Sequence, residues 1–289
     1  MSVIIKDELK HSLNLISIPK RIVSLVPSQT ELLFSLGLDE EVVGITKFCV
    51  RPYGWFRKKQ RVGGTKTVKT EVVKALQPDL IIANKEENVK EQIEELRQLA
   101  PVWVSDIKTL DDAVEMIISA GKLLNKETRA NELVSGINAA FGQIEPLDKK
   151  LNTAYFIWKN PYMAAGGDTF IDDMLSRCGF VNIFKNTNRY PEVSINKYSI
   201  TNTQQSIGNN TLSAGNHLSH SEPSSFENCQ LLLLSSEPYP FKQKHLEELQ
   251  PLLPATKIIL ADGEMFSWYG SRLLHAAAYF KNLIQQIQV

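Results

Sequence analysis

The chain is poor in cysteine and carries no excess of charge of either sign. Its 289 residues include three cysteines, and 32 basic residues balance 32 acidic ones. Cys49, Cys178 and Cys229 are widely separated, with neither metal-binding spacing nor a CxxC pair, so we predict that they are buried apolar residues. Since no basic patch or acidic tail stands out, we expect neither nucleic acid nor a membrane surface as a partner.

Long hydrophobic runs are also missing. No window approaches the roughly 18 continuous apolar residues of a membrane-spanning helix, so we expect no membrane span. In residues 1–21, charges are interleaved with apolar residues, without the apolar core of roughly 7–15 residues found in a secretory signal. We therefore expect no export, and a cytoplasmic location if Met1 is the native start. A chain of this length can build two domains with separate cores.

Motifs of common enzymes are absent as well. There is no GxSxG, HExxH or P-loop, and no GxGxxG between a strand and a helix. Asp172 and Asp173 are adjacent on a predicted helix and so point apart, and residues 166–168 (Gly-Gly-Asp) fit either an anion-binding turn or a plain turn before a helix. His217 and His220 are too few for a metal site. We expect no enzyme, no intrinsic cofactor and no metal centre.

Strand-like and helix-like segments alternate twice, over residues 21–105 and 152–262. Between them, residues 109–144 have apolar residues at steps of three and four, with Thr109 and Asp112 as a capped start and Asn125 at a break between two helices. This pattern predicts an α/β fold with two lobes, each a mainly parallel sheet flanked by helices, joined by a long rigid interlobe helix. Two ordinary surface helices of one α/β domain are the alternative.

The predicted domains are an N-terminal lobe over residues 1–108, a helical linker over 109–148 and a C-terminal lobe over 149–289. In the first lobe a buried strand runs into a helix at Pro27, where Ser28 and Glu31 fit a capping box and Gly37 ends the helix. Such a strand–helix junction presents backbone N–H groups at the edge where parallel sheets bind ligands. The predicted strands are residues 21–26, 41–46, 79–83, 102–105, 153–158, 230–234 and 257–260.

Two further segments complete the second lobe. Residues 270–287 form a closing helix, in which Leu273, Leu274, Ala277, Phe280 and Leu283 are predicted to face the core. Residues 198–228 are rich in Ser, Asn, Thr and Gln and predict a polar, mobile insert.

At this point the sequence resembles a known family. Residues 26–37 (VPSQTELLFSLG), 62–65 (VGGT), 71–83 (EVVKALQPDLIIA), 165–170 (AGGDTF) and 175–184 (LSRCGFVNIF) follow the order and spacing of the helical-backbone (class III) periplasmic substrate-binding proteins. Residues 191–194 and 262–272 continue the match. These proteins serve ABC importers of cobalamin, ferric siderophores and haem, and the chain is most similar to the cobalamin-binding branch.

The resemblance implies a ligand between the two lobes, against aromatic and polar side chains. Carried over by position, the ligand-binding residues are Gln29, Thr30, Phe48, Arg51, Trp55, Thr65, Lys85, Trp158, Tyr162, Met265, Phe266, Trp268 and Tyr269. Trp and Tyr offer large, stiff faces with a polar edge, which suit a flat macrocycle or a catechol. Since Trp55, Trp268 and Tyr269 lie in glycine-punctuated loops, we expect them to be exposed, whereas Trp158 and Phe266 fit either ligand contact or core. Arg51, Lys66 and Lys85 fit either ligand carboxylates or a solvated surface.

The resemblance also implies one carboxylate per lobe for docking to an importer permease. Glu71 matches the first, and Glu192 lies near the second, which aligns with Asn196. The function implied is that of a monomeric importer receptor whose ligand is a cobalt corrinoid, a ferric siderophore or haem. A cytosolic corrinoid- or chelate-binding salvage protein on the same fold is the alternative, and an enzyme using the cleft is the third possibility.

Overall fold

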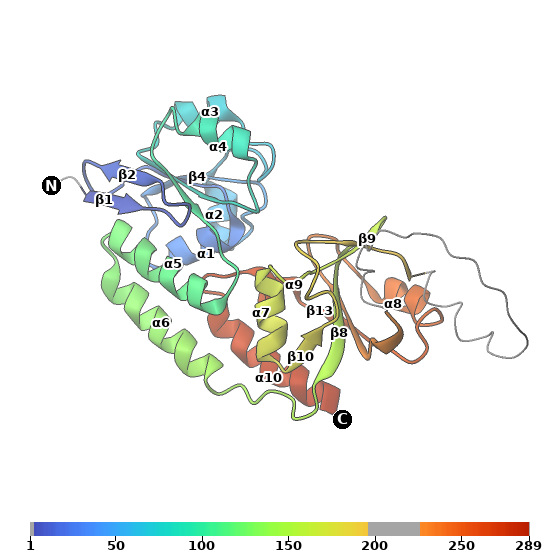
Figure 1. Cartoon of the computed structure of the whole chain (residues 1–289). Helices are drawn as coiled ribbons and strands as arrows, with labels where there is room; N and C mark the ends of the chain where they lie inside the picture. The colour runs from blue at the N-terminus through green and yellow to red at the C-terminus, as the bar shows by residue number, and fades with distance from the viewer. Residues whose placement is uncertain (1–2, 196–225, 289) are drawn as a thin grey trace, which may run out of the picture. The chain divides into compact units, whose positions relative to one another are not determined.

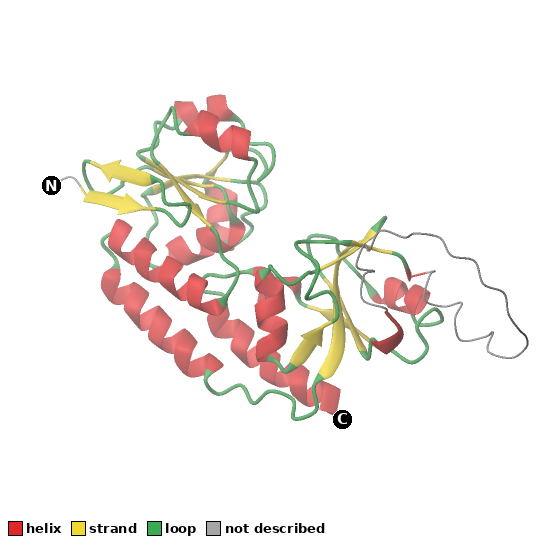
Figure 2. Ribbon diagram, viewed as in Figure 1, coloured by secondary structure: helices red, strands yellow, loops and turns green. Residues whose placement is uncertain are grey.

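The computed structural model describes residues 3–195 and 226–288, which form two compact units. Unit 1 comprises residues 1–144 and 267–283, and unit 2 comprises residues 145–266 and 284–289. Each unit contains a mainly parallel sheet with helices around it, which confirms the predicted fold class (Figures 1 and 2). The predicted domain limits at residues 108 and 148 stay predictions. Most of the predicted insert, residues 198–225, lies outside the described residues.

Unit 1 is built on a parallel sheet with the strand order β5-β4-β3-β6-β7. The strands are β3 (Ile22–Ser24), β4 (Val42–Ile45), β5 (Gln60–Arg61), β6 (Leu80–Asn84) and β7 (Val102–Ser105). A separate hairpin pairs β1 (Val3–Lys6) with β2 (Ser12–Leu15). Four of the five sheet strands were predicted from their apolar runs. The fifth, β5, was not, because Gln60 and Arg61 form no apolar run. The hairpin was not predicted either, and its longest apolar run is the three residues Val3–Ile5.

Short helices connect these strands, and Figure 1 shows α3 and α4 together beside the sheet. They are α1 (Pro27–Ser35), α2 (Tyr53–Lys58), α3 (Thr70–Ala75) and α4 (Lys90–Leu96). The predicted capping box at the start of α1 is wrong. Val26 is the N-cap residue, no side chain caps the helix, and Pro27 already occupies its first turn. The Glu31 carboxylate instead pairs with the Arg272 guanidinium, whose Nε lies 3.0 Å from Oε2.

The two helices after β7 begin and break where the sequence predicts. At the start of α5 (Leu110–Leu123), the Asp112 N–H donates to Thr109 Oγ1 (3.1 Å) and the Asp112 carboxylate accepts from the Thr109 N–H (2.9 Å). Asn125, with φ of 55°, separates α5 from α6 (Glu127–Phe141). The helices approach closely at Gly121, where a Cβ would lie 2.5 Å from the Ala130 methyl. Their role as a rigid connection stays a prediction.

The last helix, α10 (Leu273–Gln288), contributes residues 273–283 to unit 1. Phe280 is fully buried and packs edge-on against Phe141 of α6, with ring centroids 6.2 Å apart. The prediction that Leu274 faces the core is wrong, because this side chain is exposed and lies beside Gly136 on the surface of α6.

Unit 2 contains a mixed sheet with the strand order β11-β9-β8-β12-β13, and β10 also pairs with β8. The strands are β8 (Leu151–Trp158), β9 (Tyr162–Ala164), β10 (Phe180–Asn182), β11 (Glu192–Val193), β12 (Leu231–Ser235) and β13 (Lys257–Ala261). The helices are α7 (Phe170–Arg177), η2 (Phe226–Asn228, a 3₁₀ helix), α8 (Gln243–Leu249) and α9 (Gly263–Ser267). Strands β9 and β11 run antiparallel to their neighbours, whereas the other pairings are parallel. The uniformly buried β12 suits a central parallel strand.

One residue of the predicted insert, Phe226, belongs to the core of unit 2. Phe226 is buried, and its ring lies 5.8 Å from that of Phe156 and 6.1 Å from that of Phe184. A residue counted within a polar segment is therefore part of the aromatic core.

Three predicted features can be compared directly with the described residues. The three cysteines are buried and unpaired, as predicted. Among the described helices, none combines the length and apolar character needed to cross a bilayer. The described residues contain no group of three or more His, Cys, Asp or Glu side chains placed to hold a metal ion. His217 and His220 lie outside them.

Candidate functional site

The carboxyl ends of the parallel strands in unit 1 bring several polar side chains together. After β3 and β4, Ser24 Oγ and Thr30 Oγ1 are 2.8 Å apart, and Thr30 Oγ1 lies 3.1 Å from Cys49 Sγ. Thr46 Oγ1 lies 3.1 Å from the same sulfur. Burial raises the pKa of the Cys49 thiol. The protonated thiol thus acts as a hydrogen-bonding core residue, and predicted ligand residue Thr30 is part of the scaffold.

A second network links the loops that follow β3, β5, β6 and β7. Gln29 Nε2 donates to Ser105 Oγ (2.6 Å), and Asn84 Nδ2 donates to the same oxygen (3.0 Å). Asn88 accepts from the Asn84 N–H (2.9 Å) and donates to the Thr65 carbonyl (2.9 Å). The structure therefore brings predicted residues Gln29 and Thr65 to one edge of the sheet.

Gln29 also retains hydrogen-bonding capacity. Its side chain is almost fully buried, yet Oε1 accepts no hydrogen bond from the described residues. Buried acceptors are normally satisfied by protein or water. Among the described residues, Gln29 Oε1 is therefore a buried acceptor without a donor.

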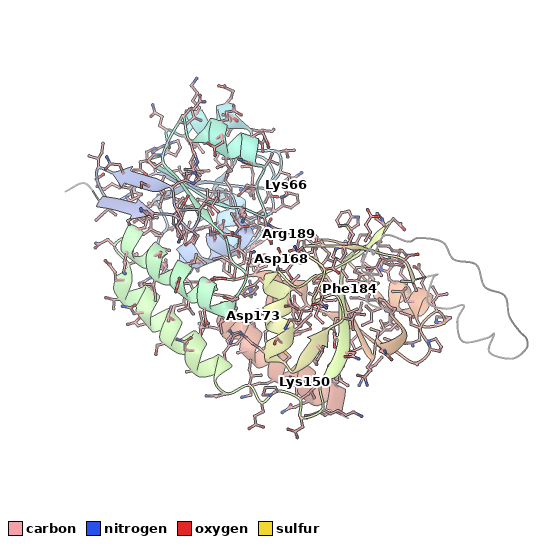
Figure 3. The ribbon with its side chains drawn as sticks, in the orientation of Figure 1. Lys66, Lys150, Asp168, Asp173, Phe184 and Arg189 are labelled. Atoms are coloured by element: carbon pink, nitrogen blue, oxygen red, sulfur yellow. The ribbon has the colours of Figure 1, made fainter. Side chains whose placement is uncertain are left out.

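Charged groups surround this network. Asn84 Oδ1 accepts from the backbone N–H groups of Glu86 (2.8 Å) and Glu87 (3.1 Å). Burial raises the pKa of the Glu87 carboxyl, an effect that Lys66 opposes and Glu86 reinforces. Lys66, labelled in Figure 3, donates to the Glu86 carbonyl. Predicted residue Lys85 is exposed and lies 2.5 Å from Asp106, so part of its charge is neutralised within the unit.

The segment after β4 presents Phe48 and Arg51 to solvent, as a ligand contact requires. The expectation that Trp55 is exposed is wrong: its side chain is 4% exposed and its ring meets Phe34 edge-on, with centroids 5.5 Å apart. The reason is local, because residues 53–58 form helix α2 and turn Trp55 toward α1.

The residues after α9 are also buried, against expectation. Trp268 is 6% exposed, and the Arg272 guanidinium lies 5.2 Å from its ring centroid. Tyr269 is equally buried, and burial raises the pKa of its phenol well above the usual value. The chain passes close to α1 at the next residue, since a Cβ on Gly270 would lie 2.7 Å from the Ser28 carbonyl oxygen.

Unit 2 places an aromatic cluster at the end of β8. Trp158 is 40% exposed and meets Tyr239 edge-on, with centroids 5.8 Å apart. Tyr162 is half-buried and stacks on Phe156, with centroids 5.4 Å apart. The two predicted ligand aromatics thus keep accessible surface. The ring centroids of Tyr239 and Phe241 are also close, 4.8 Å apart.

The other two predicted residues of unit 2 differ from each other. Phe266 is fully buried against Tyr155, with ring centroids 4.8 Å apart. Of the two alternatives that the sequence left open, ligand contact or core, the structure shows that Phe266 is a core residue. Met265 is half-buried. Its role as a ligand residue stays a prediction.

The turn at Gly166-Gly167-Asp168 does not offer free anion-binding groups. The N–H groups of Gly166 and Gly167 donate to the carbonyls of Arg189 (2.7 Å) and Thr187 (2.9 Å). A Cβ on Gly167 would lie 1.8 Å from the Lys185 carbonyl oxygen. Asp168 pairs with Arg189, Oδ2 to Nε 3.5 Å, and the two lie together in Figure 3. Close backbone packing therefore explains the glycines.

The two predicted docking carboxylates are both exposed. Glu71 lies in the first turn of α3 in unit 1, and Glu192 lies on β11 in unit 2. Surface placement is what docking requires, and their role stays a prediction.

Comparison with known proteins decides the family. Residues 22–219 match a family model described as "Periplasmic binding protein". The chain belongs to this family. A vitamin B12-binding protein of Vibrio campbellii is 29% identical over 184 residues, which cover 61% of this chain and 66% of that protein. The chain thus spans about two thirds of the length of the curated relatives it matches first.

Solved structures give the same fold. The periplasmic vitamin B12-binding protein BtuF of Vibrio cholerae superposes with a TM-score of 0.68 at 20% identity, covering 94% of this chain and 98% of that one. The petrobactin-binding protein YclQ of Bacillus subtilis gives a TM-score of 0.76 at 18% identity, covering 99% of both chains. The family-level resemblance predicted from the sequence is confirmed.

Several residues of this edge were missed by sequence reasoning. Asn88 and Ser105 complete the amide network, and Glu87 adds the shifted carboxyl. One signal was available, since Asn84 and Asn88 stand four residues apart directly after a predicted strand. The partner Ser105 lies on another strand, so local spacing could not identify it.

Proposed function

We propose that the chain is the substrate-binding component of an ABC-type importer, with a metal chelate as its ligand: a cobalt corrinoid, a ferric siderophore or haem. The observation that carries the proposal is the family match over residues 22–219. The names of its relatives support it. A vitamin B12-binding protein is similar to the chain in sequence, and a petrobactin-binding protein is similar to it in fold.

The chemistry of each unit is consistent with such a ligand. Unit 1 presents exposed Phe48 and Arg51. Unit 2 presents the partly exposed rings of Trp158 and Tyr162. Aromatic faces bind flat macrocycles, and a guanidinium binds carboxylates or phosphates of a ligand. The ligand position between the two lobes, implied by the resemblance, stays a prediction.

The first test is a thermal-shift and tryptophan-fluorescence titration with hydroxocobalamin, cobinamide, a ferric siderophore panel and haemin. Ligand at about 100 times its dissociation constant should stabilise the protein by roughly 2.7 kcal/mol. Binding of none of these chelates would contradict the proposal.

Site placement is tested on the ligand that binds. Trp158→Ala should weaken binding by roughly tenfold, since loss of one ring contact costs on the order of 1–3 kcal/mol. Leu252→Ala is the matched control, because Leu252 is an exposed apolar residue of the same unit that is not a predicted ligand residue. Equal affinity in both variants would remove Trp158 from the site.

Uptake of the labelled chelate by cells with and without the gene separates an importer component from a salvage protein.

A further inference from the structure

Unit 1 concentrates positive charge in one stretch of the chain. Residues 42–70 contain eight Lys and Arg residues and no Asp or Glu, although the whole chain is neutral. The expectation of no basic patch rests on the charge of the whole chain, which does not show this local concentration. Whole-chain charge hides it, because acidic residues are distributed elsewhere.

Not all of this charge is available to a partner. Lys59 pairs with Asp39 at 3.0 Å, and its own side chain is largely buried. Arg61 is half-buried, with its guanidinium 4.4 Å from the centroid of the Phe56 ring. The accessible basic residues of the first half of the stretch include Lys47, Arg57 and Lys58, which are all exposed.

Exposed apolar side chains alternate with these cations. Phe48 is 50% exposed, Val50 42% and Tyr53 68%. Their direction follows from their neighbours, because Cys49 and Trp55 are buried and anchor the two segments to the core of the unit. We name the outward residues Lys47, Phe48, Val50, Tyr53, Arg57 and Lys58 the basic–aromatic surface.

The cations and rings of this surface are paired in a way that leaves the charge accessible. Lys47 Nζ lies 5.0 Å from the centroid of Phe48, and the Arg57 guanidinium lies 5.7 Å from that of Tyr53. A cation over a ring gains electrostatic attraction but keeps its net charge. Arg57 and Lys58 also lie in the last turn of α2, where cations favour the helix dipole. That structural role does not explain why Val50 and Tyr53 are exposed, and Phe48, which is also a predicted ligand residue, adds its ring to the same segment.

We propose that the basic–aromatic surface docks unit 1 on an anionic phospholipid surface. Lysine and arginine near an anionic leaflet are attracted to its headgroups, and aromatic rings prefer the interface between headgroups and acyl chains. The proposal rests on the proposed function for its setting, since an importer component works beside a membrane. Nucleic acid also attracts basic and aromatic surfaces, and that alternative is an outcome of the test.

The test is co-sedimentation of the purified chain, without chelate, with vesicles of phosphatidylcholine alone or with about 30% phosphatidylglycerol. The protein should bind only the anionic vesicles, and binding should fall steeply between about 0.05 M and about 0.5 M salt. Arg57→Glu/Lys58→Glu should weaken binding at least about tenfold, because two positive charges at the surface become negative.

The matched control is Lys149→Glu/Lys150→Glu, which makes the same charge change at exposed residues of unit 2 (Lys150 is labelled in Figure 3). Tyr53→Ser tests the aromatic part and should weaken binding while salt dependence remains. Melting temperatures check that each variant is folded. Equal vesicle binding by the two double variants would overturn the proposal. Absence of vesicle binding would also overturn it, as would binding to a single-stranded oligonucleotide in its place.

Failure of this proposal is distinguishable from failure of the proposed function. Chelate titrations on the same preparations do not require vesicles, and neither Arg57 nor Lys58 is a predicted ligand residue. A chain that binds a chelate but no anionic vesicle keeps its proposed function and loses this docking surface.

Discussion

At the carboxyl ends of its strands, unit 1 places amides and hydroxyls, whereas unit 2 places aromatic rings. In unit 1, Gln29, Asn84 and Ser105 are buried and joined by hydrogen bonds. In unit 2, Trp158 and Tyr162 pack on other rings and keep exposed surface. Hydrogen-bonded networks fix geometry, and stacked rings offer an apolar contact that tolerates small displacements. Strands β6 and β7 of unit 1 therefore end in a fixed polar edge, whereas β8 of unit 2 ends in an aromatic surface.

The largest expected effect is in the aromatic core of unit 2. Phe226→Ala removes a buried ring that contacts Phe156 and Phe184, and it should lower the free energy of unfolding by about 3–5 kcal/mol. Urea denaturation measures the loss. Val181→Ala on β10 is the control, since Val181 is exposed and should cost little. A small effect of Phe226→Ala would mean that the ring is not part of the core.

The polar edge of unit 1 should be the next most sensitive. Asn84→Ala deletes the side chain that donates to Ser105 and accepts from the N–H groups of Glu86 and Glu87. Buried groups left without partners cost about 1–3 kcal/mol, so a loss of about 2–4 kcal/mol is expected. Asn131→Ala, at an exposed position of α6, should change stability little. Equal effects of the two changes would show that the network is dispensable.

These two regions also differ in how far the sequence could predict them. Trp158 and Tyr162 were identified as candidates because large aromatics are visible in the sequence and the resemblance places them. The network of unit 1 joins Gln29 to Ser105 across 76 positions, and such a pairing depends on strand order and register, which no local pattern contains. The exposure predicted for Trp55 was wrong for a similar reason. Trp55 follows Gly54 and was predicted to lie in a loop, yet residues 53–58 form a short helix that turns the ring inward.

Strands were predictable where burial on both faces leaves an apolar run. Leu231–Ser235 and Leu80–Asn84 are uniformly buried, and both were predicted within one residue at each end. Strand β5, of two residues, and the hairpin β1–β2 carry no such run. The ligand class proposed for this chain comes from the family resemblance, because periodicity alone carries no information about a ligand.

The third prediction concerns a carboxyl group of unit 1, Glu8, and how the stability of the protein depends on pH. Burial, reinforced by Asp7 and Asp106, raises the pKa of the Glu8 carboxyl from its usual 4.5 to about 7. The protonated carboxyl therefore contributes stability that is fully present below about pH 4.5 and is lost as pH rises through about 7. Wild type should lose on the order of 1–3 kcal/mol relative to Glu8→Gln over this range.

Urea denaturation at several pH values measures this difference. The exposed Glu95→Gln is the control and should follow wild type. Parallel pH profiles for wild type and Glu8→Gln would show that folding does not shift the pKa of Glu8.

The smallest effect on the isolated protein is expected at the two predicted docking carboxylates, one on each unit. Glu71→Ala and Glu192→Ala remove exposed charges, so melting temperature and chelate affinity should stay close to wild type, since exposed charges contribute at most about 1 kcal/mol. Transport should fall, because a charge that pairs with a permease at the interface costs more to lose than a solvated one.

Cellular uptake of the labelled chelate by each variant decides this prediction. Glu71 matches the family position and Glu192 only lies near it, so Glu71→Ala should reduce uptake more. Glu91→Ala, another exposed glutamate in the first turn of a helix of unit 1, is the matched control and should leave uptake unchanged. If Glu71→Ala transports as well as Glu91→Ala, the docking surface does not include α3. If both docking variants lose chelate affinity, the two carboxylates act on the ligand and not on a permease.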